Sequence, residues 1–204
     1  SMVWVWQFPK ETMNWGAEID YIASARMNGT EYLRAKWLDP AVNRPVFRSR
    51  TGLKKFKKFH CPPMDGSPVV DAVWRDIILQ FVPEDRVQFL PIRLIARGEV
   101  CDEYFWPIVM DRVICIDTEK SDITQKLQNE KGLFIYRVRT FVHIPGCLGP
   151  LHLARDAHMK SHLLVSDELK SALSATGEDS MFFQPSEVAT IQNYIDGSNG
   201  QTLN

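Results

Sequence analysis

No part of the chain is apolar for long enough to cross a membrane. Its 204 residues contain no run that approaches the ~18 apolar residues of a spanning helix. The opening MVWVWQF is a short apolar stretch that meets Pro9 and Lys10, whereas a secretory signal needs a basic start and a longer apolar segment. The sequence therefore predicts a cytoplasmic protein without membrane association.

Cysteine is scarce and forms no metal-binding pattern. The chain has four cysteines (Cys61, Cys101, Cys115 and Cys147), widely spaced and without a CxxC pair, which disfavours metal ligation by thiolates. A chain of this size buries roughly 70% of its unfolded surface and needs no disulfide framework. We expect all four residues to be reduced thiols.

Recognisable catalytic motifs are also missing. The sequence contains no GxSxG nucleophile elbow, no P-loop and no dinucleotide-binding GxGxxG. Cys101 lies among acidic residues, whose negative charge disfavours a reactive thiolate. We therefore predict a protein without catalytic activity and without a cofactor.

The charge of the chain is nearly balanced overall but unevenly distributed. Residues 1–60 carry 11 Lys and Arg against 5 Asp and Glu, whereas the net charge of the whole chain is −1. Within the basic stretch 48–60 (RSRTGLKKFKKFH), Phe56 and Phe59 alternate with lysines, as in some single-stranded nucleic-acid sites. One alternative function is therefore a nucleic-acid-binding module. The slightly acidic chain and the missing RNA-binding signature favour a solvated basic face instead.

Strand and helix patterns are mixed along the chain, and several strand connections are too short for a crossover helix. This favours an α+β fold with an antiparallel or mixed sheet and helices packed mainly on one side. Strands are predicted near residues 1–8, 87–97, 104–110, 113–117, 133–144, 151–154 and 181–183, and helices at 71–81, 167–175 and about 188–195.

We expect a single domain over residues 1–204. The Pro- and Gly-rich segment 61–68 is the best candidate for an internal boundary. It would separate a basic N-terminal portion, 1–60, from an α+β core, 69–196. The polar tail 197–204 is expected to be frayed.

The cluster that most resembles a catalytic site is HLARDAHMKSH. His158 and His162 are four residues apart, which on a helix places both imidazoles on one face, as in helical metal sites. Asp156 is a third potential ligand, but Met159 stands where the HExxH pattern has its glutamate. A metal-dependent hydrolase built on these residues is a second alternative, and an exposed, polar approach to a helix is the simpler interpretation.

Three phrases follow one another in the second half of the chain. The first, EYFWPIVMDRVICIDTEKSDI, ends in an Asp-x-Glu-x-Ser turn at Asp117, Glu119 and Ser121. The second is the strand pattern LFIYRVRTFVHI. The third is HLARDAHMKSHLLVSDELKSALSATGEDSMFF, in which Ser166 caps a helix with acidic residues in its first turn.

This order resembles the bacterial immunity proteins of polymorphic toxin systems, specifically the family often called immunity protein eleven. That family has a "Y…(V/I)xxhDxexS" phrase, then a strand, then "lvSdelkxal…g…gxxF". The resemblance covers about residues 99–185, and residues 1–98 match no pattern that we can name. It implies a protein that binds and neutralises a cognate toxin by covering its active site or substrate groove, without catalysis.

The resemblance assigns no contact residues, so the interface is predicted from charge. A nuclease toxin has a basic groove for phosphate, which an acidic surface would complement. Tyr104 and Trp106 are candidate aromatic anchors at such a surface. The full predicted partner-binding set is Glu99, Asp102, Glu103, Tyr104, Trp106, Asp111 and Glu119.

Overall fold

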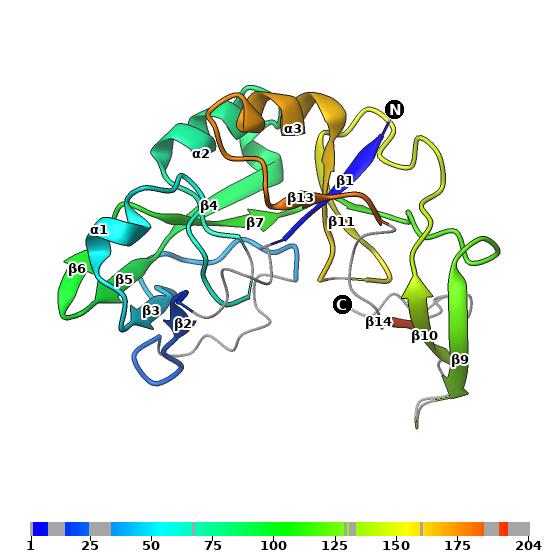
Figure 1. Ribbon diagram of the computed structural model, residues 1–204, viewed down its shortest axis with the longest axis horizontal. Coiled ribbons are helices and arrows are strands. Elements are labelled where there is room, and N and C mark those ends of the chain that lie inside the picture. The colour runs from blue at the N-terminus through cyan, green and yellow to red at the C-terminus, as the bar shows by residue number, and fades with distance from the viewer. Residues whose placement is uncertain are drawn as a thin grey trace. The chain divides into compact units, whose positions relative to one another are not determined.

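The chain divides into two compact units, which are described separately (Figure 1). The computed structural model describes residues 2–7, 15–24, 34–66, 68–128, 130, 134–159, 161–185 and 192–195. The first unit comprises Ser1–Trp6, Asp111–Lys170 and Phe182–Asn204, and the second comprises Gln7–Met110 and Ser171–Met181. The segment 61–68 lies inside the second unit. The single-domain organisation stays a prediction, and the tail 197–204 lies outside the described residues.

A five-stranded sheet forms the centre of the first unit. Its order is β13, β1, β12, β11, β8, formed by Phe182–Phe183, Val3–Trp6, Leu163–Ser166, Leu153–Asp156 and Arg112–Val113. The β11–β8 pair is parallel, and the other neighbouring pairs are antiparallel. Every residue of β11 and β12 is buried, which is typical of central strands covered on both faces.

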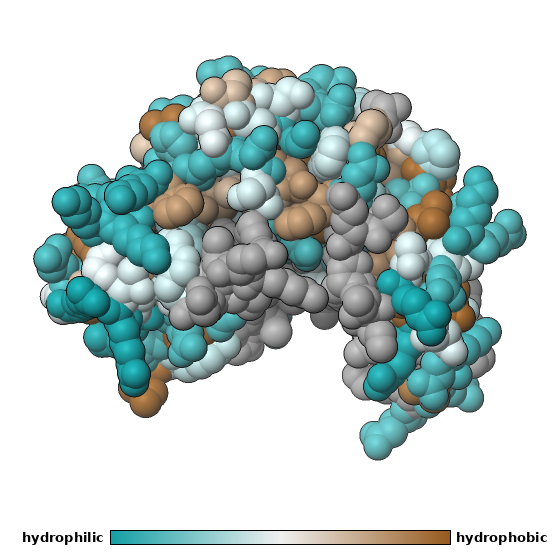
Figure 2. All heavy atoms as spheres, viewed as in Figure 1, coloured by the Kyte–Doolittle hydropathy of each residue, from teal (hydrophilic) through white to brown (hydrophobic). Residues whose placement is uncertain are grey.

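A second, three-stranded sheet of the first unit is much more exposed. It runs in the order β14 (Gln192–Ile195), β10 (Phe134–Thr140) and β9 (Asp122–Gln128), with both pairs antiparallel. Six of the seven residues of β9 are exposed. Hydrophilic side chains cover much of β9 and β10 on the face shown in Figure 2. The predicted helix about 188–195 is wrong for the described residues 192–195, which form β14. Backbone pairing with β10 outweighs the weak helical pattern there.

Cys115 and Cys147 form a disulfide in the first unit, which contradicts the expectation of four reduced thiols. Their Cα atoms are 5.1 Å apart, within the range that a disulfide needs. The two residues are 32 positions apart in sequence and pack against a buried cluster that includes Val5 and Leu164. Sequence spacing gave no sign of this pairing. Cys61 and Cys101 are buried free thiols.

The second unit contains a four-stranded sheet and a separate strand pair. The sheet order is β2 (Glu18–Ile19), β3 (Val46–Ser49), β5 (Arg93–Ala96) and β6 (Glu99–Cys101), with only the β3–β5 pair parallel. The strand pair is β4 (Val87–Pro91) with β7 (Phe105–Val109), antiparallel. Both pack around one core, in which the Phe47 and Trp106 rings meet edge to face at 5.7 Å.

The single strand predicted over 87–97 is two strands in different sheets. Pro91 lacks an amide donor and ends β4, after which the chain joins the other sheet at Arg93. The strand predicted at 104–110 is confirmed, and so is the coarse α+β class, since the described sheets are antiparallel and mixed. Packing of helices on one side stays a prediction. No helix in the described part of the chain has the length and apolar character to span a membrane.

Short helices accompany these sheets. They are α1 (Leu53–Phe56), α2 (Ala72–Leu79), the 3-10 turn η3 (Glu84–Arg86) and α3 (Asp167–Ser174). Asp71 caps α2 as predicted, because its Oδ1 accepts a hydrogen bond from the Trp74 amide at 3.0 Å. Its other oxygen lies 2.7 Å from Nδ1 of His60, whose ring stacks on Trp74. One carboxylate therefore fixes both the start of α2 and the preceding loop.

Replacing Asp71 with alanine should cost about 1–2 kcal/mol of stability, because the helix loses its cap and His60 loses its partner. Asp71→Asn keeps a capping side chain and should cost less. Urea unfolding measures the effect. Asp76→Ala is the control on the same helix, since its carboxylate is 64% exposed and pairs with the adjacent Arg75, and it should change stability by no more than about 0.5 kcal/mol. Equal losses for Asp71→Ala and Asp76→Ala would contradict the capping role.

Candidate partner-binding site

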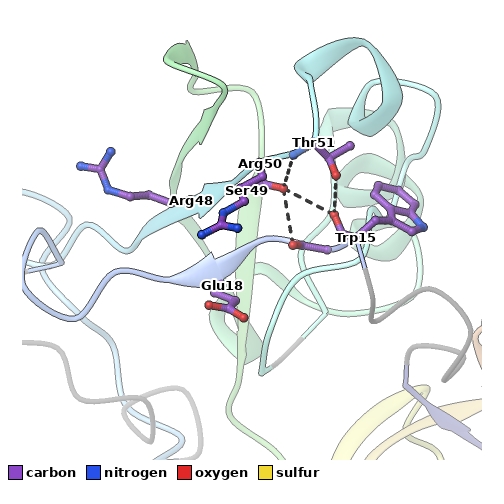
Figure 3. A pocket seen from close by; sticks show the side chains of 7 residues that line it. Trp15, Glu18, Arg48, Ser49, Arg50 and Thr51 are labelled. Atoms are coloured by element: carbon purple, nitrogen blue, oxygen red, sulfur yellow. Dashed lines mark hydrogen bonds between the residues drawn. The ribbon is translucent and has the colours of Figure 1, made fainter.

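The basic stretch borders a depression in the surface of the second unit (Figure 3). The cavity has a volume of about 480 Å³ and lies where β2 and β3 meet the loop leading to α1. Its lining residues are Trp15, Gly16, Glu18, Arg48, Ser49, Arg50 and Thr51. Two segments that are distant in sequence therefore form one concave site.

Backbone carbonyls and two hydroxyl groups hold these segments together. Thr51 Oγ1 donates to the Trp15 carbonyl at 2.9 Å, and Ser49 Oγ lies 3.4 Å from the same oxygen. Ser49 Oγ also accepts from the Thr51 amide at 3.0 Å. Figure 3 shows this small network beside the Trp15 ring. The floor of the depression is thus fixed by local hydrogen bonds.

Gly16 is needed for close approach of the chain to Pro63. A Cβ at position 16 would lie 2.9 Å from the Pro63 carbonyl oxygen, which is too close for any side chain. The neighbouring amide of Ala17 donates to that same oxygen at 3.1 Å. This contact positions Trp15 at one end of the depression.

Arg48 is neutralised within the chain. Its guanidinium pairs with Asp20, and its side chain extends in the opposite direction from Trp15 in Figure 3. Asp20 also accepts hydrogen bonds from the amides of Ala23 and Ile22. The Ala23 amide, together with Arg48, holds the pKa of Asp20 below its usual value.

Other cations at the depression have no carboxylate partner in the described part of the chain. Among the described residues, neither Arg50 nor Lys55 forms an ion pair, and both are exposed. Lys55 Nζ lies 4.2 Å from the centre of the Trp15 ring, a cation–π contact. The Trp15 ring also packs against Phe56 and Phe59, with ring centres 5.3 and 5.6 Å apart. Glu18 is the one acidic side chain in the lining of the depression.

Arg97 adds a third cation from a neighbouring hairpin. The two-residue loop Arg97–Gly98 joins β5 to β6 with φ values of 50° and 79°, a combination that favours Asn-Gly. A left-handed conformation costs an arginine roughly 1–2 kcal/mol. The Arg97 Nε atom donates to the Arg50 carbonyl at 2.6 Å, so its exposed side chain lies beside the depression.

The predicted acidic interface is divided between the two units. Tyr104 and Trp106 are 3% and 1% exposed, so both rings are core residues that a partner cannot reach. Asp102 and Glu103 are exposed but paired. Asp111 and Glu119 belong to the first unit. The structure therefore brings together only Glu99, Asp102 and Glu103.

Ion pairs offset the charge of two of these carboxylates. Asp102 accepts two hydrogen bonds from Arg93 at 2.9 Å and lies 2.9 Å from Arg44, and these guanidinium groups lower its pKa. Glu103 lies 3.0 Å from Lys57 Nζ, which likewise lowers its pKa. Glu99 is exposed and has no ion pair among the described residues.

The histidines predicted to share a helical face do not lie on a helix. His158 and His162 lie in the turn that connects β11 to β12, and His162 is 3% exposed. Asp156 Oδ1 accepts from the amides of His158 and Met159, at 2.8 and 2.9 Å, and so closes this turn. No group of three or more His, Cys, Asp or Glu residues in the described part of the chain could hold a metal ion. The helical face on which the metal-dependent alternative relied is therefore absent at these residues, and the alternative itself stays a prediction.

The phrases behind the family resemblance have structural roles. Asp117 Oδ1 accepts from the amides of Glu119 and Lys120 at 3.0 Å, and Ser121 Oγ accepts from the Val142 amide at the same distance. Ser166 Oγ accepts from the Leu169 amide at 3.1 Å, which confirms the predicted cap of α3. These motifs define turns and helix ends, and in the third of them the Ser166 hydroxyl also lies 2.8 Å from Nδ1 of His152.

Sequence reasoning identified the basic stretch but missed Trp15, Glu18 and Arg97 as its neighbours. The Arg97–Gly98 pair between two alternating segments was a usable hairpin signal. Nothing local indicated that Trp15 would contact residues 49–51, because that pairing depends on β2 and β3 meeting in the folded chain.

Comparison with known proteins agrees with the resemblance and extends it. The model of the immunity protein family (Imm11) matches residues 43–188. The shared region therefore begins well before residue 99. For residues 43–98, the statement that no pattern could be named is corrected by this match. Arg50, Lys55 and Arg97 lie within the match, and Trp15 and Glu18 precede it. A search of curated proteins found no match. Since the family match spans more than half of its length, this chain belongs to the immunity protein family Imm11.

Proposed function

We propose that this chain binds a cognate bacterial toxin and neutralises it by occlusion, without catalysis. The observation that carries the proposal is the family match over residues 43–188. An immunity protein acts on a toxin partner, and a preformed surface is sufficient to block an active site or a substrate groove.

Occlusion requires a surface of adequate size on a stable scaffold. Specific protein interfaces bury about 1,600 Å² in total, or about 800 Å² on each partner. The hydrogen-bonded depression borders the strands β2 and β3, and β9 and β10 form an exposed antiparallel strand pair. Either surface can present side chains to a toxin without a large ordering cost.

A nuclease toxin remains the prediction that follows from an acidic interface. Glu99 and Glu119 are its exposed members without an ion pair among the described residues, whereas Asp102 and Glu103 are paired. Cytoplasmic action remains a prediction as well. Trapping of free thiols in intact cells tests it, because the cytosol would keep Cys115 and Cys147 reduced.

Co-expression tests the proposal. The toxin encoded beside the gene for this chain should arrest growth when expressed alone, and the chain should restore growth and co-purify with the toxin in one complex. Asp71→Asn serves as the matched control, because Asp71 lies in the second unit but does not line the depression. Growth arrest that the chain leaves unchanged, with no complex formed, would refute toxin neutralisation.

A further inference from the structure

We propose that the depression bordered by Arg50, Lys55 and Arg97 is the docking site for an acidic segment of the toxin. This inference rests on the proposed function and names the chemistry of the partner. The segment would present two or more Asp or Glu carboxylates to the depression. The predicted acidic interface adjoins it, since Glu99 pairs with Ala96 in the hairpin that carries Arg97.

Within the described residues, no carboxylate offsets the positive charge at the depression. The structure pairs Arg44, Arg48, Arg93 and Lys57 with carboxylates of the same chain. In the described residues, Arg50 and Lys55 have no such pairing, and Arg97 bonds only to a carbonyl. Three exposed cations around one concavity form a positive site that attracts carboxylates and disfavours a basic partner.

The shape of the depression also suits a docked peptide segment. A cavity of about 480 Å³ can accept one or two side chains and the backbone that carries them. Its floor is held by the Ser49 and Thr51 hydroxyl groups, so it needs little rearrangement on binding. Trp15 supplies an aromatic wall, and its contact with Lys55 holds that ammonium group at the rim. Aromatic and arginine side chains of this kind are typical binding hot spots.

The backbone conformation of Arg97 also points to a role in binding. The loop would be more stable with asparagine or glycine at this position, since both tolerate positive φ. An arginine retained there at a conformational cost is a sign that the side chain serves another purpose. Its bond to the Arg50 carbonyl holds the guanidinium beside a residue that lines the depression.

Charge reversal tests the site directly. The probe is the purified toxin encoded beside the gene for this chain, and its affinity is measured by titration calorimetry at two salt concentrations. The double variant Arg50→Glu/Lys55→Glu should bind at least 100-fold more weakly than the wild type. The control Lys36→Glu changes one exposed cation of the same unit outside the depression, and it should remain within about threefold of the wild type.

Arg97→Asn separates binding from folding. Asparagine suits the left-handed position, so the melting temperature should stay equal or rise. Affinity for the toxin should fall about tenfold, because one cation at the rim is lost. Unchanged affinity in both Arg97→Asn and the double variant overturns the docking site.

The remaining outcomes discriminate between the hypotheses. If wild-type chain binds the toxin and only Glu99→Lys weakens the complex, the docking site is wrong while toxin neutralisation stands. If wild-type chain does not bind the toxin, both fail. Salt-sensitive binding of single-stranded oligo(dT) that the double variant abolishes, with toxin binding unaffected, assigns the depression to nucleic acid and overturns the proposal.

Discussion

Acidification from pH 7 to pH 4.5 is expected to lower the free energy of unfolding by roughly 2–3 kcal/mol through His162 alone. His162 is 3% exposed, and neither ring nitrogen has a hydrogen-bond partner among the residues that the structure describes. Its imidazole meets the Phe141 ring edge to face at 4.8 Å. Burial is the main cause that lowers its pKa to about 4, and the nearby His143 adds a smaller contribution.

The direction of the effect follows from proton linkage. The folded pKa of His162 lies below the unfolded value near 6.5, so the unfolded chain binds more protons between these two values. Stability is therefore fully present above pH 6.5 and declines as the pH falls toward 4. Burial also lowers the pKa of His143, although the neighbouring Asp156 opposes that shift. His143 should therefore act in the same direction.

His162→Phe tests this origin, because phenylalanine fills the apolar site beside Phe141 and does not titrate. The variant should lose most of the decline in stability between pH 6.5 and 4.5, measured by urea unfolding at several pH values. His158→Gln, four residues away in the partly exposed turn, is the control and should keep the wild-type profile. A His162→Phe profile as steep as that of the wild type would contradict the role of burial.

Loss of the Cys115–Cys147 disulfide is expected to destabilise the first unit by roughly 3–4 kcal/mol. The bond closes a loop with a sequence separation of 32 and so restricts the unfolded chain. A change of this size lowers the melting temperature by roughly 10 °C in a protein of about 200 residues. Both cysteines pack inside the first unit, where Cys115 is fully buried and Cys147 lies against the same cluster.

Matched cysteine variants distinguish this bond from the free thiols. Reductant should lower the melting temperature of the wild type and of Cys61→Ser/Cys101→Ser, while Cys115→Ser/Cys147→Ser should be less stable and insensitive to reductant. Thiol counting in denaturant gives the complementary result, with two reactive thiols before reduction and four after. Four reactive thiols in the unreduced protein would show that the pair is not bonded.

Helix caps and turns could be predicted from the sequence where a single side chain determines the local structure. Asp71 and Ser166 cap their helices because a short polar side chain can reach a nearby amide. Asp117 likewise closes its turn within a few residues. These signals need no tertiary information. The strand β9 was missed because its polar, exposed residues have little of the alternation that marks a half-buried strand.

The candidate site was predictable only in part. Composition identified the basic stretch 48–60, but charge counts do not show which cations are neutralised by distant carboxylates. Arg48 and Lys57 are paired, whereas Arg50 and Lys55 have no ion pair in the described part of the chain. The acidic residues near Glu99 were chosen from charge alone, and the same pairing removes Asp102 and Glu103 from a free acidic surface. Pairing of this kind depends on the sheet order, which no local pattern specifies.

The most direct test of neutralisation by occlusion is a titration of toxin activity with purified chain. The account predicts that activity falls linearly with added chain and reaches its minimum near one chain per toxin. It also predicts that intact toxin is recovered after the complex is separated in denaturant. Complete inactivation by far less than one equivalent, or recovery of a chemically altered toxin, would show catalysis and contradict the account.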